Sequence, residues 1–135
     1  MQSNIATAWL REFAESANAY DHARHMGMIS AKVQLFGVPG FDVIGFDDWS
    51  RQCEQEFSER AVREIRFEGL DVVAMTPLKI MFKTRESLSL ADGSAIEHPV
   101  EMLIEKEADS KWRLTQERVL SEEEAAFDAN RKVKS

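Results

Sequence analysis

The feature that most constrains this chain is its second half, where four strand-like runs follow one another with tight turns between them. These predicted strands cover residues 62–75, 78–90, 95–106 and 111–120. In the second run apolar and polar side chains alternate, which is typical of a strand with one buried face and one wet face. Asp92-Gly93 marks a hairpin, because both residues tolerate positive backbone φ angles, and Gly69 marks a bulge that bends the first run. The pattern predicts a curled antiparallel meander.

The first half of the chain is predicted to be helical and to cover the concave side of that meander. A helix over about residues 5–20 has one apolar face, because its large side chains recur at three- and four-residue spacing. Asp21 caps a shorter second helix, and a short strand starts at Lys32. A third helix follows and ends at about Glu59. The fold class predicted is therefore α+β, a curved antiparallel β-sheet wrapped around N-terminal helices to form a cone with an internal pocket.

Composition limits the classes of function. A chain of 135 residues is expected to form one domain, residues 1–135, with a core that needs no disulfides. The single cysteine, Cys53, lies on a helical apolar face and is predicted to be an inert core residue. A net charge of −7 argues against nucleic-acid binding. The sequence has no apolar run that could span a bilayer and no secretory signal at its start, so no membrane association is predicted and the cytoplasm is the expected compartment.

The order of the predicted elements resembles the nuclear transport factor 2-like superfamily, which includes the SnoaL-like polyketide cyclases and ketosteroid isomerase. The resemblance covers nearly all of residues 5–120. It is carried by the segment NAYDHARHMGMISAKVQLFGVPGFDVIGFDDW, by the long strand that ends in LSLADG and by the hairpin IEKEADSKWRL. It implies a strongly curved sheet, a mostly apolar pocket at the wide end of the cone, and a homodimer that pairs through the outer face of the sheet.

The resemblance also indicates where the catalytic groups of ketosteroid isomerase would fall. The tyrosine that donates a hydrogen bond falls on Phe13, and the aspartate base falls within Leu35-Phe36-Gly37. Only the protonated acid keeps a carboxyl, at Glu101. Because proton transfer and oxyanion stabilisation are each worth on the order of 100-fold or more in rate, we predict no ketosteroid isomerase activity.

Two residues are candidates for acid–base chemistry, Glu101 and His98. Glu101 lies in the apolar run 100–104, and if it is buried without a partner it would hold its proton and donate to a ligand. The alternative is that it faces solvent or pairs with Arg118. His98 precedes Pro99, which holds it extended, and its ring is a candidate base at the pocket mouth.

The predicted pocket wall combines aromatic residues with two polar residues of the last strand. Strict alternation places Trp112, Leu114, Gln116 and Arg118 on one face, pointing into the cone. His22 and His25 stand three residues apart in a helical segment, which is a thin basis for a metal site, so no metal is predicted. No cofactor motif appears either. The predicted ligand-pocket residues are Phe13, Tyr20, Phe36, Trp49, Trp112, Gln116 and Arg118.

The leading functional prediction is a SnoaL-like cone domain that binds a small, largely apolar ligand. A second prediction is an isomerase, dehydratase or cyclase in which Glu101, assisted by His98 or Arg118, performs acid–base catalysis. A third is a non-catalytic interaction module whose outer sheet face, carrying Val73, Met75 and Met81, binds a protein partner.

Overall fold

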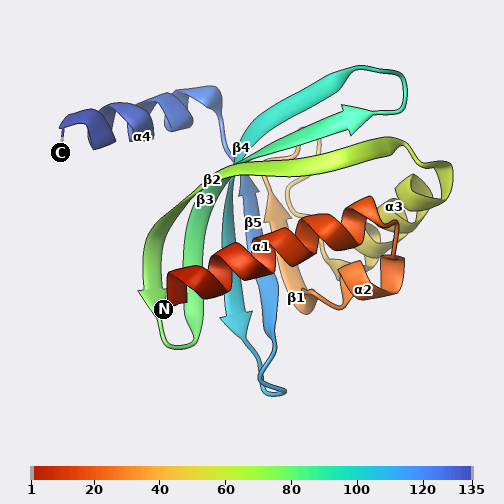
Figure 1. Ribbon diagram of the computed structural model, residues 1–135, viewed down its shortest axis with the longest axis horizontal. Coiled ribbons are helices and arrows are strands. Elements are labelled where there is room, and N and C mark those ends of the chain that lie inside the picture. The colour runs from red at the N-terminus through yellow and green to blue at the C-terminus, as the bar shows by residue number, and fades with distance from the viewer. Residues whose placement is uncertain (1, 135) are drawn as a thin grey trace.

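The computed structural model describes the backbone of residues 2–134 and the side chains of residues 4–128. Figure 1 shows a sheet with helix α1 lying across it and helices α2 and α3 at one end. The elements are α1 Gln2–Asn18, α2 His22–Met26, β1 Ile29–Phe36, α3 Phe46–Glu59, β2 Val62–Thr76, β3 Lys79–Leu90, β4 Ala95–Lys106, β5 Trp112–Val119 and α4 Glu122–Lys134. The predicted strands and helices are thus present with small shifts in their ends.

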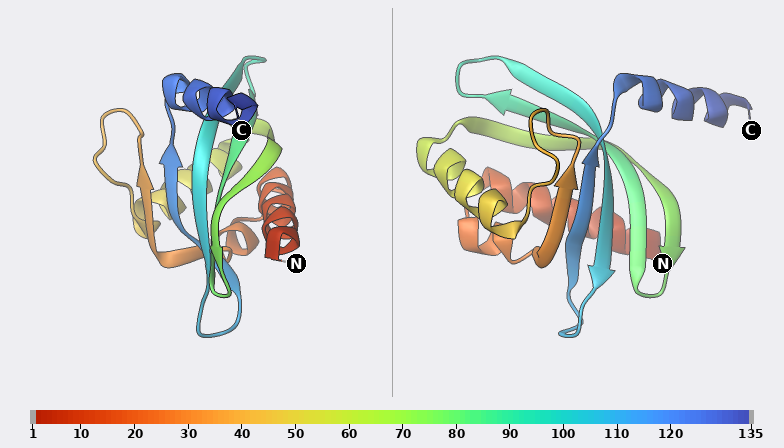
Figure 2. Two further views of the ribbon diagram at one scale, coloured as in Figure 1. Left: turned by 90° about the vertical axis from the view of Figure 1, so that its left-hand side faces the viewer. Right: turned by 180° about the vertical axis from the view of Figure 1, so that it is seen from behind.

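The five strands form one curved sheet in the order β1-β5-β4-β3-β2 (Figures 1 and 2). Strands β2 to β5 pair antiparallel, as the sequence predicts, and the bulge expected at Gly69 appears as a shift of register between Glu68 and Asp71. Strand β1 joins β5 in parallel, so the sheet is mixed. A parallel pair needs a long crossover, and here the chain between β1 and β5 contains a helix and three strands.

The concave face of the sheet carries the core. Phe82 on β3 and Met102 on β4 stand opposite each other, and both side chains are fully buried. Across the core, the ring of Trp9 on α1 lies 6.4 Å from that of Phe82 and stacks on Phe13 at 4.7 Å. These contacts between α1 and the inner rows of the sheet confirm the predicted wrapping of the sheet around the N-terminal helices.

Two helices begin with a capping side chain, and the cap of α2 is the predicted Asp21. The Asp21 carboxylate accepts a hydrogen bond from the Arg24 N–H at the start of α2, and the Ser121 hydroxyl accepts one from the Glu124 N–H at the start of α4. Helix α2 is short and ends at Met26, because Met28 already bonds to the sheet. The carbonyl of Met28 accepts from the N–H of Leu114.

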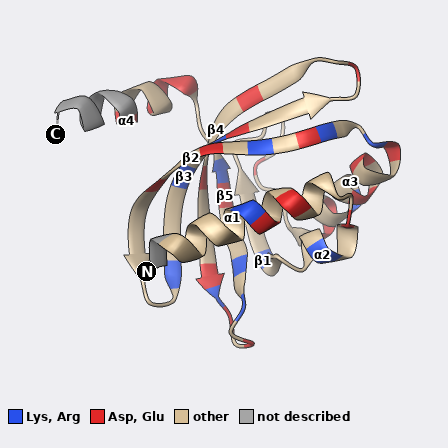
Figure 3. Cartoon of the chain, viewed as in Figure 1, with Lys and Arg blue, Asp and Glu red and all other residues tan. Residues whose placement is uncertain are grey.

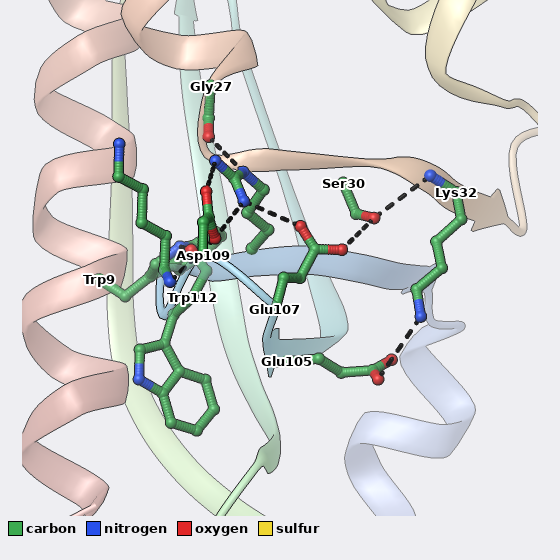
Figure 4. Close-up of polar contacts among 10 residues, drawn as sticks. Trp9, Gly27, Ser30, Lys32, Glu105, Glu107, Asp109 and Trp112 are labelled. Atoms are coloured by element: carbon green, nitrogen blue, oxygen red, sulfur yellow. Dashed lines mark hydrogen bonds and ion pairs between the residues drawn. The ribbon is translucent and has the colours of Figure 1, made fainter.

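Polar contacts join the β4–β5 turn to the α2–β1 junction (Figure 4). The guanidinium of Arg113 donates to the carboxylates of Glu107 and Asp109 and to the carbonyl of Gly27, at 2.8–3.0 Å. Ser30 donates to the other oxygen of Glu107 at 2.8 Å. These polar groups are satisfied by one another, so this cluster stabilises the fold.

No described helix combines the length and the apolar character needed to cross a membrane. Charged residues of both signs occupy exterior positions, and acidic residues mark the first turn of α4, which projects from the sheet (Figure 3).

Replacing Gly37 with alanine is expected to destabilise the protein by about 2 kcal/mol or more, because Gly37 has a φ of +88° and an added Cβ would collide with the Val119 carbonyl oxygen. Gly40 is a matched control, since its φ is +89° but no atom lies within 4 Å of the added Cβ. Gly40→Ala should cost only the conformational strain of about 1 kcal/mol. Urea denaturation measures both, and equal losses would contradict the close approach of β1 to β5.

Candidate functional site

Strand β5 contains a bulge that decides which of its side chains face the interior. Leu114 pairs with Ile104 and Gln116 pairs with Leu103, so Thr115 is an extra residue on β5. Beyond the bulge, Glu117 lies opposite the fully buried Met102 and therefore on the concave face. The prediction that Gln116 and Arg118 line the pocket is wrong, because the extra residue turns both to the outer face.

Glu117 is the most unusual polar residue of the concave face. It stands between Met102 on β4 and Leu35 on β1, and only 6% of the residue is exposed. Within residues 4–128, no group donates a hydrogen bond to its carboxylate, and every side-chain nitrogen or oxygen that is sealed from solvent has a hydrogen-bond partner. The Glu117 carboxyl is therefore buried but still touched by solvent.

The environment of Glu117 favours its protonated form. Burial is the main cause that raises the pKa of this carboxyl well above its ordinary value, and repulsion from the Glu86 carboxylate raises it further. Glu117 thus holds its proton at pH values where exposed glutamates are ionised. A neutral carboxyl in an apolar surrounding is a hydrogen-bond donor and a proton source.

Glu86 and His98 form an ion pair on the same face. They lie opposite each other on β3 and β4, and His98 Nε2 lies 2.7 Å from the Glu86 carboxylate. This hydrogen bond is the largest cause of a raised pKa for His98, and it outweighs partial burial, which lowers the pKa. Phe67 on β2 lies opposite Glu86 and gives this pair an apolar neighbour.

A second histidine, His25 on α2, is buried and faces the core from the helical side. Its Nδ1 lies 2.8 Å from the Ser16 hydroxyl, and its ring stacks on Phe13 at 4.3 Å and contacts Phe57 at 5.7 Å. Burial lowers the pKa of His25 to about 4. His22 points elsewhere, since its Nε2 contacts Ser50, so the two histidines engage different partners.

His98 and His25 give opposite pH dependences. Because Glu86 raises the pKa of His98, the stabilisation from this pair is complete below about pH 6.5 and is lost as pH rises through the folded-state pKa. Because burial lowers the pKa of His25, its contribution is lost as pH falls from about 6.5 towards 4. NMR titration of the imidazole protons measures the pKa of each histidine. Glu86→Gln should lower the pKa of His98 and leave the pKa of His25 unchanged. Two midpoints near 6.5 would contradict this arrangement.

Glu101, the acid candidate from sequence, lies on the outer face. Its carboxylate accepts a hydrogen bond from Arg118 Nε at 3.1 Å, so the pairing that the sequence left open is present. Arg118 also contacts Glu124 of α4 at 3.3 Å. Glu101 is 8% exposed. Glu101 is therefore both buried and paired, beneath the α4 side of the sheet and opposite to the face of Glu117.

Breaking the Glu101–Arg118 pair is expected to show a structural role. Arg118→Met leaves a buried carboxylate without its partner and should destabilise the protein by about 2 kcal/mol, less than a sealed pair would because Arg118 is 38% exposed. Adding Glu101→Gln should recover most of the loss. Urea denaturation tests this, and a double variant as unstable as Arg118→Met would contradict it.

The other predicted wall residues occupy several environments. Phe13 is buried in the core, and Trp49 and Trp112 are half-buried against it. The Tyr20 hydroxyl donates to the Val62 carbonyl. Phe36 pairs with Arg118 on the outer face, so its placement in the wall is wrong. Two surface hollows, of about 520 and 220 Å³, lie between α1 and β2 and beneath α4, and Glu117 lines neither.

Cys53 is buried, and burial raises the pKa of its thiol to about 12. A thiol with such a pKa is a poor nucleophile at neutral pH. This agrees with the prediction of an inert core cysteine.

The sequence matches no known protein-family profile. It also matches no curated protein. Solved structures do match the fold. A nuclear transport factor 2-like protein of unknown function from Shewanella oneidensis MR-1 superposes with a TM-score of 0.74 at 16% identity, over 88% of this chain and 98% of that chain.

Two further structures agree with the first. A ketosteroid isomerase-like protein from Erwinia carotovora atroseptica SCRI1043 gives a TM-score of 0.60 at 17% identity, over 85% of this chain and 93% of that chain. A protein of unknown function with a cystatin-like fold from Nostoc punctiforme PCC 73102 gives 0.66 at 11% identity, over 84% and 86%. The chain therefore has the nuclear transport factor 2-like fold, a cystatin-like α+β cone, as the sequence resemblance implies.

Proposed function

We propose that this protein binds a small, largely apolar molecule between the helices and the concave face of its sheet, with Glu117 as the central polar contact. The observation that carries the proposal is a carboxyl that is 94% buried and has no hydrogen-bond donor within residues 4–128. Burying a polar group costs free energy unless a hydrogen bond compensates for the water contacts that it loses. Such a cost is typical of functional sites, where a ligand supplies the missing contact.

A second candidate function is acid–base catalysis, an isomerisation, dehydration or cyclisation. The acid proposed from sequence, Glu101, is replaced by Glu117, because Glu101 is paired on the outer face. Glu117 would donate a proton to a substrate oxygen, and His98, held by Glu86, would be the cation on the same face. The favouring observation is that two carboxyls of the concave face have different environments: burial raises the pKa of Glu117, and Glu86 is paired with His98. His98 keeps its proposed catalytic role.

The homodimer through the outer sheet face and the cytoplasmic location remain predictions from sequence. For the dimer, the outer face of the sheet offers the apolar pair Met81 and Leu103, and Val73 is an exposed apolar residue of β2. The acidic start of α4 lies over another part of that face, where Glu122 and Glu124 contact Arg85 and Arg118. A partner sheet would have to lie beside α4.

Thermal unfolding against a library of neutral aromatic and alicyclic compounds tests the proposed binding. A ligand present at 100 times its dissociation constant stabilises the folded state by about 2.7 kcal/mol, which raises Tm by several degrees in a protein of this size. Compounds that raise Tm of the wild type should lose the effect in Glu117→Leu and keep it in Gln116→Leu, the matched outer-face variant. A library without any shift, or equal shifts in both variants, would overturn the proposal.

A further inference from the structure

Helix α4 covers part of the outer sheet face through ion pairs. Three basic residues of the sheet, which we call the basic row, pair with three acids of the helix at 2.6–3.3 Å: Lys83 with Asp128, Arg85 with Glu122 and Arg118 with Glu124. The one large apolar side chain within residues 122–128 is Phe127, and it is 63% exposed. Figures 1 and 2 show α4 projecting away from the sheet. Charge therefore dominates the attachment of this part of the helix.

An attachment of this kind is weak. The side chains of the three acids are between 23% and 65% exposed, and exposed ion pairs contribute little and are screened by salt. A helix of 13 residues is marginal in water by itself, so α4 depends on its contacts with the sheet. We therefore expect α4 to leave the basic row more readily than a helix that buries an apolar face.

The fit between α4 and the surface below it is incomplete. A hollow of about 220 Å³ lies beneath the helix. Ala125 lines it from the helix, Pro99 and Leu120 line it from the body of the protein, and Lys83 and Arg85 form part of its wall. The methyl group of Ala125 does not fill this space. Helix α4 thus matches the charges of the basic row but not the shape of the surface between them.

The residues around the hollow indicate the chemistry of a better match. Carboxylates suit the basic row, as the acids of α4 demonstrate. Inside the hollow Glu68 and Asp71 would repel a further carboxylate, whereas Pro99 and Leu120 offer apolar contacts. The group that enters the hollow should therefore be apolar.

We propose that the basic row is a docking site for an acidic helix of a partner protein, which carries a large apolar residue where α4 has Ala125. In the free protein α4 occupies this site as a weaker intramolecular substitute. A partner helix takes the place of α4, pairs its carboxylates with the basic row and fills the hollow with its apolar side chain. This site lies on the outer face, so it is independent of the binding proposed for the concave face.

The test uses two synthetic peptides with the sequence of residues 121–134, one unchanged and one with Ala125→Leu. Helix α4 is joined to β5 through only two residues, so its effective concentration is about millimolar and a separate peptide competes poorly with it in the wild type. A neutral-α4 variant of the full chain, with Glu122→Gln, Glu124→Gln and Asp128→Asn together, removes the three ion pairs. Fluorescence anisotropy measures the dissociation constants at about 150 mM salt, where the net charge of −7 is screened beyond about 8 Å.

The Ala125→Leu peptide should bind the neutral-α4 variant about tenfold more tightly than it binds the wild type. It should also bind that variant about tenfold more tightly than the unchanged peptide does, because leucine buries more apolar surface than alanine. A control variant with the same change of charge at three other exposed acids, Asp42→Asn, Glu54→Gln and Glu123→Gln, should bind the peptide as weakly as the wild type. Adding Lys83→Gln and Arg85→Gln to the neutral-α4 variant should weaken the peptide at least tenfold.

A second measurement needs no change to the ion pairs. Ala125→Leu in the full chain should fill the hollow and slow amide hydrogen exchange in α4 about fivefold or more. Phe127→Leu, at an exposed position of the same helix, should leave this exchange unchanged. If the neutral-α4 variant does not fold, hydrogen exchange alone decides.

Four results would overturn the inference. They are equal peptide affinities of the neutral-α4 and control variants, equal affinities of the two peptides, unchanged exchange in Ala125→Leu, and a short DNA duplex that binds the neutral-α4 variant more tightly than either peptide. The last result would make the basic row a general anion surface instead of a site for an acidic helix.

Discussion

Replacing Glu117 with leucine is expected to raise the free energy of unfolding by about 1–3 kcal/mol and to abolish ligand binding in the interior. The gain arises because leucine fills a similar volume between Met102 and Leu35 without removing a carboxyl from most of its water. A variant that is more stable and less functional is the usual consequence of removing a functional polar group from a core. Urea denaturation and ligand titration measure the two effects.

The gain from Glu117→Leu should depend on pH. The folded-state pKa of Glu117 lies above its unfolded value of about 4.3, so the folded wild type holds the proton more tightly than the unfolded chain. The wild type therefore loses stability as pH rises from about 4 through the folded-state pKa of Glu117. The leucine variant has no such group and does not show this loss. The difference should be small at pH 4 and should grow towards neutral pH. Gln116→Leu should show no such growth, and a Glu117→Leu variant less stable than the wild type at neutral pH would contradict the burial.

Replacing Phe82 with alanine is expected to cost about 3–5 kcal/mol, the largest loss among the substitutions considered. Phe82 is fully buried at the centre of the concave face, where it meets Trp9 of α1. The neighbouring Met81 points to the outer face opposite Leu103 and is only half-buried. Met81→Ala should cost about 1 kcal/mol.

Urea denaturation of the two variants measures which face of β3 carries the core. Similar losses for Phe82→Ala and Met81→Ala would contradict a sheet with one buried and one wet face. Near-ultraviolet circular dichroism of Phe82→Ala should also change, because the tryptophan packed against Phe82 loses its neighbour.

Much of the fold was predictable because its signals are local. Alternation along β3, the Asp92-Gly93 turn and the capping serine of α4 each lie within a few residues of the element that they determine. The parallel pairing of β1 with β5 is different, since it joins segments about 80 residues apart and depends on their packing. The end of α2 at Met26 likewise depends on a contact of the following residues with β5.

The site was harder to predict, for a reason that individual residues show. Glu86 occupies a position in the buried alternation of β3, so a signal for it was present in the sequence. Glu117 was hidden because the bulge at Thr115 shifts the alternation of β5 by one residue. Because no glycine lies at this bulge, nothing in the sequence marked its position. His25 was considered only as a metal ligand, and its serine partner lies nine residues earlier on another helix.

The two acids of the central strands illustrate the limit of burial as a signal. Glu101 and Glu117 have similarly small exposed fractions, 8% and 6%. Glu101 has an arginine partner, whereas Glu117 has none within residues 4–128. The apolar neighbours of Glu101 in the sequence were a signal that it could be buried. Whether each glutamate has a charged partner depends on which face of the sheet it occupies.

The most direct test of a buried, neutral carboxyl on the concave face is a ¹³C NMR titration of the Glu117 side-chain carboxyl. The arrangement described above predicts that Glu117 keeps the chemical shift of a protonated carboxyl while exposed glutamates ionise, and that its midpoint lies well above their range. A midpoint near the ordinary value of about 4.3 would contradict it, because such a carboxyl must either face water or have a partner that stabilises its charge.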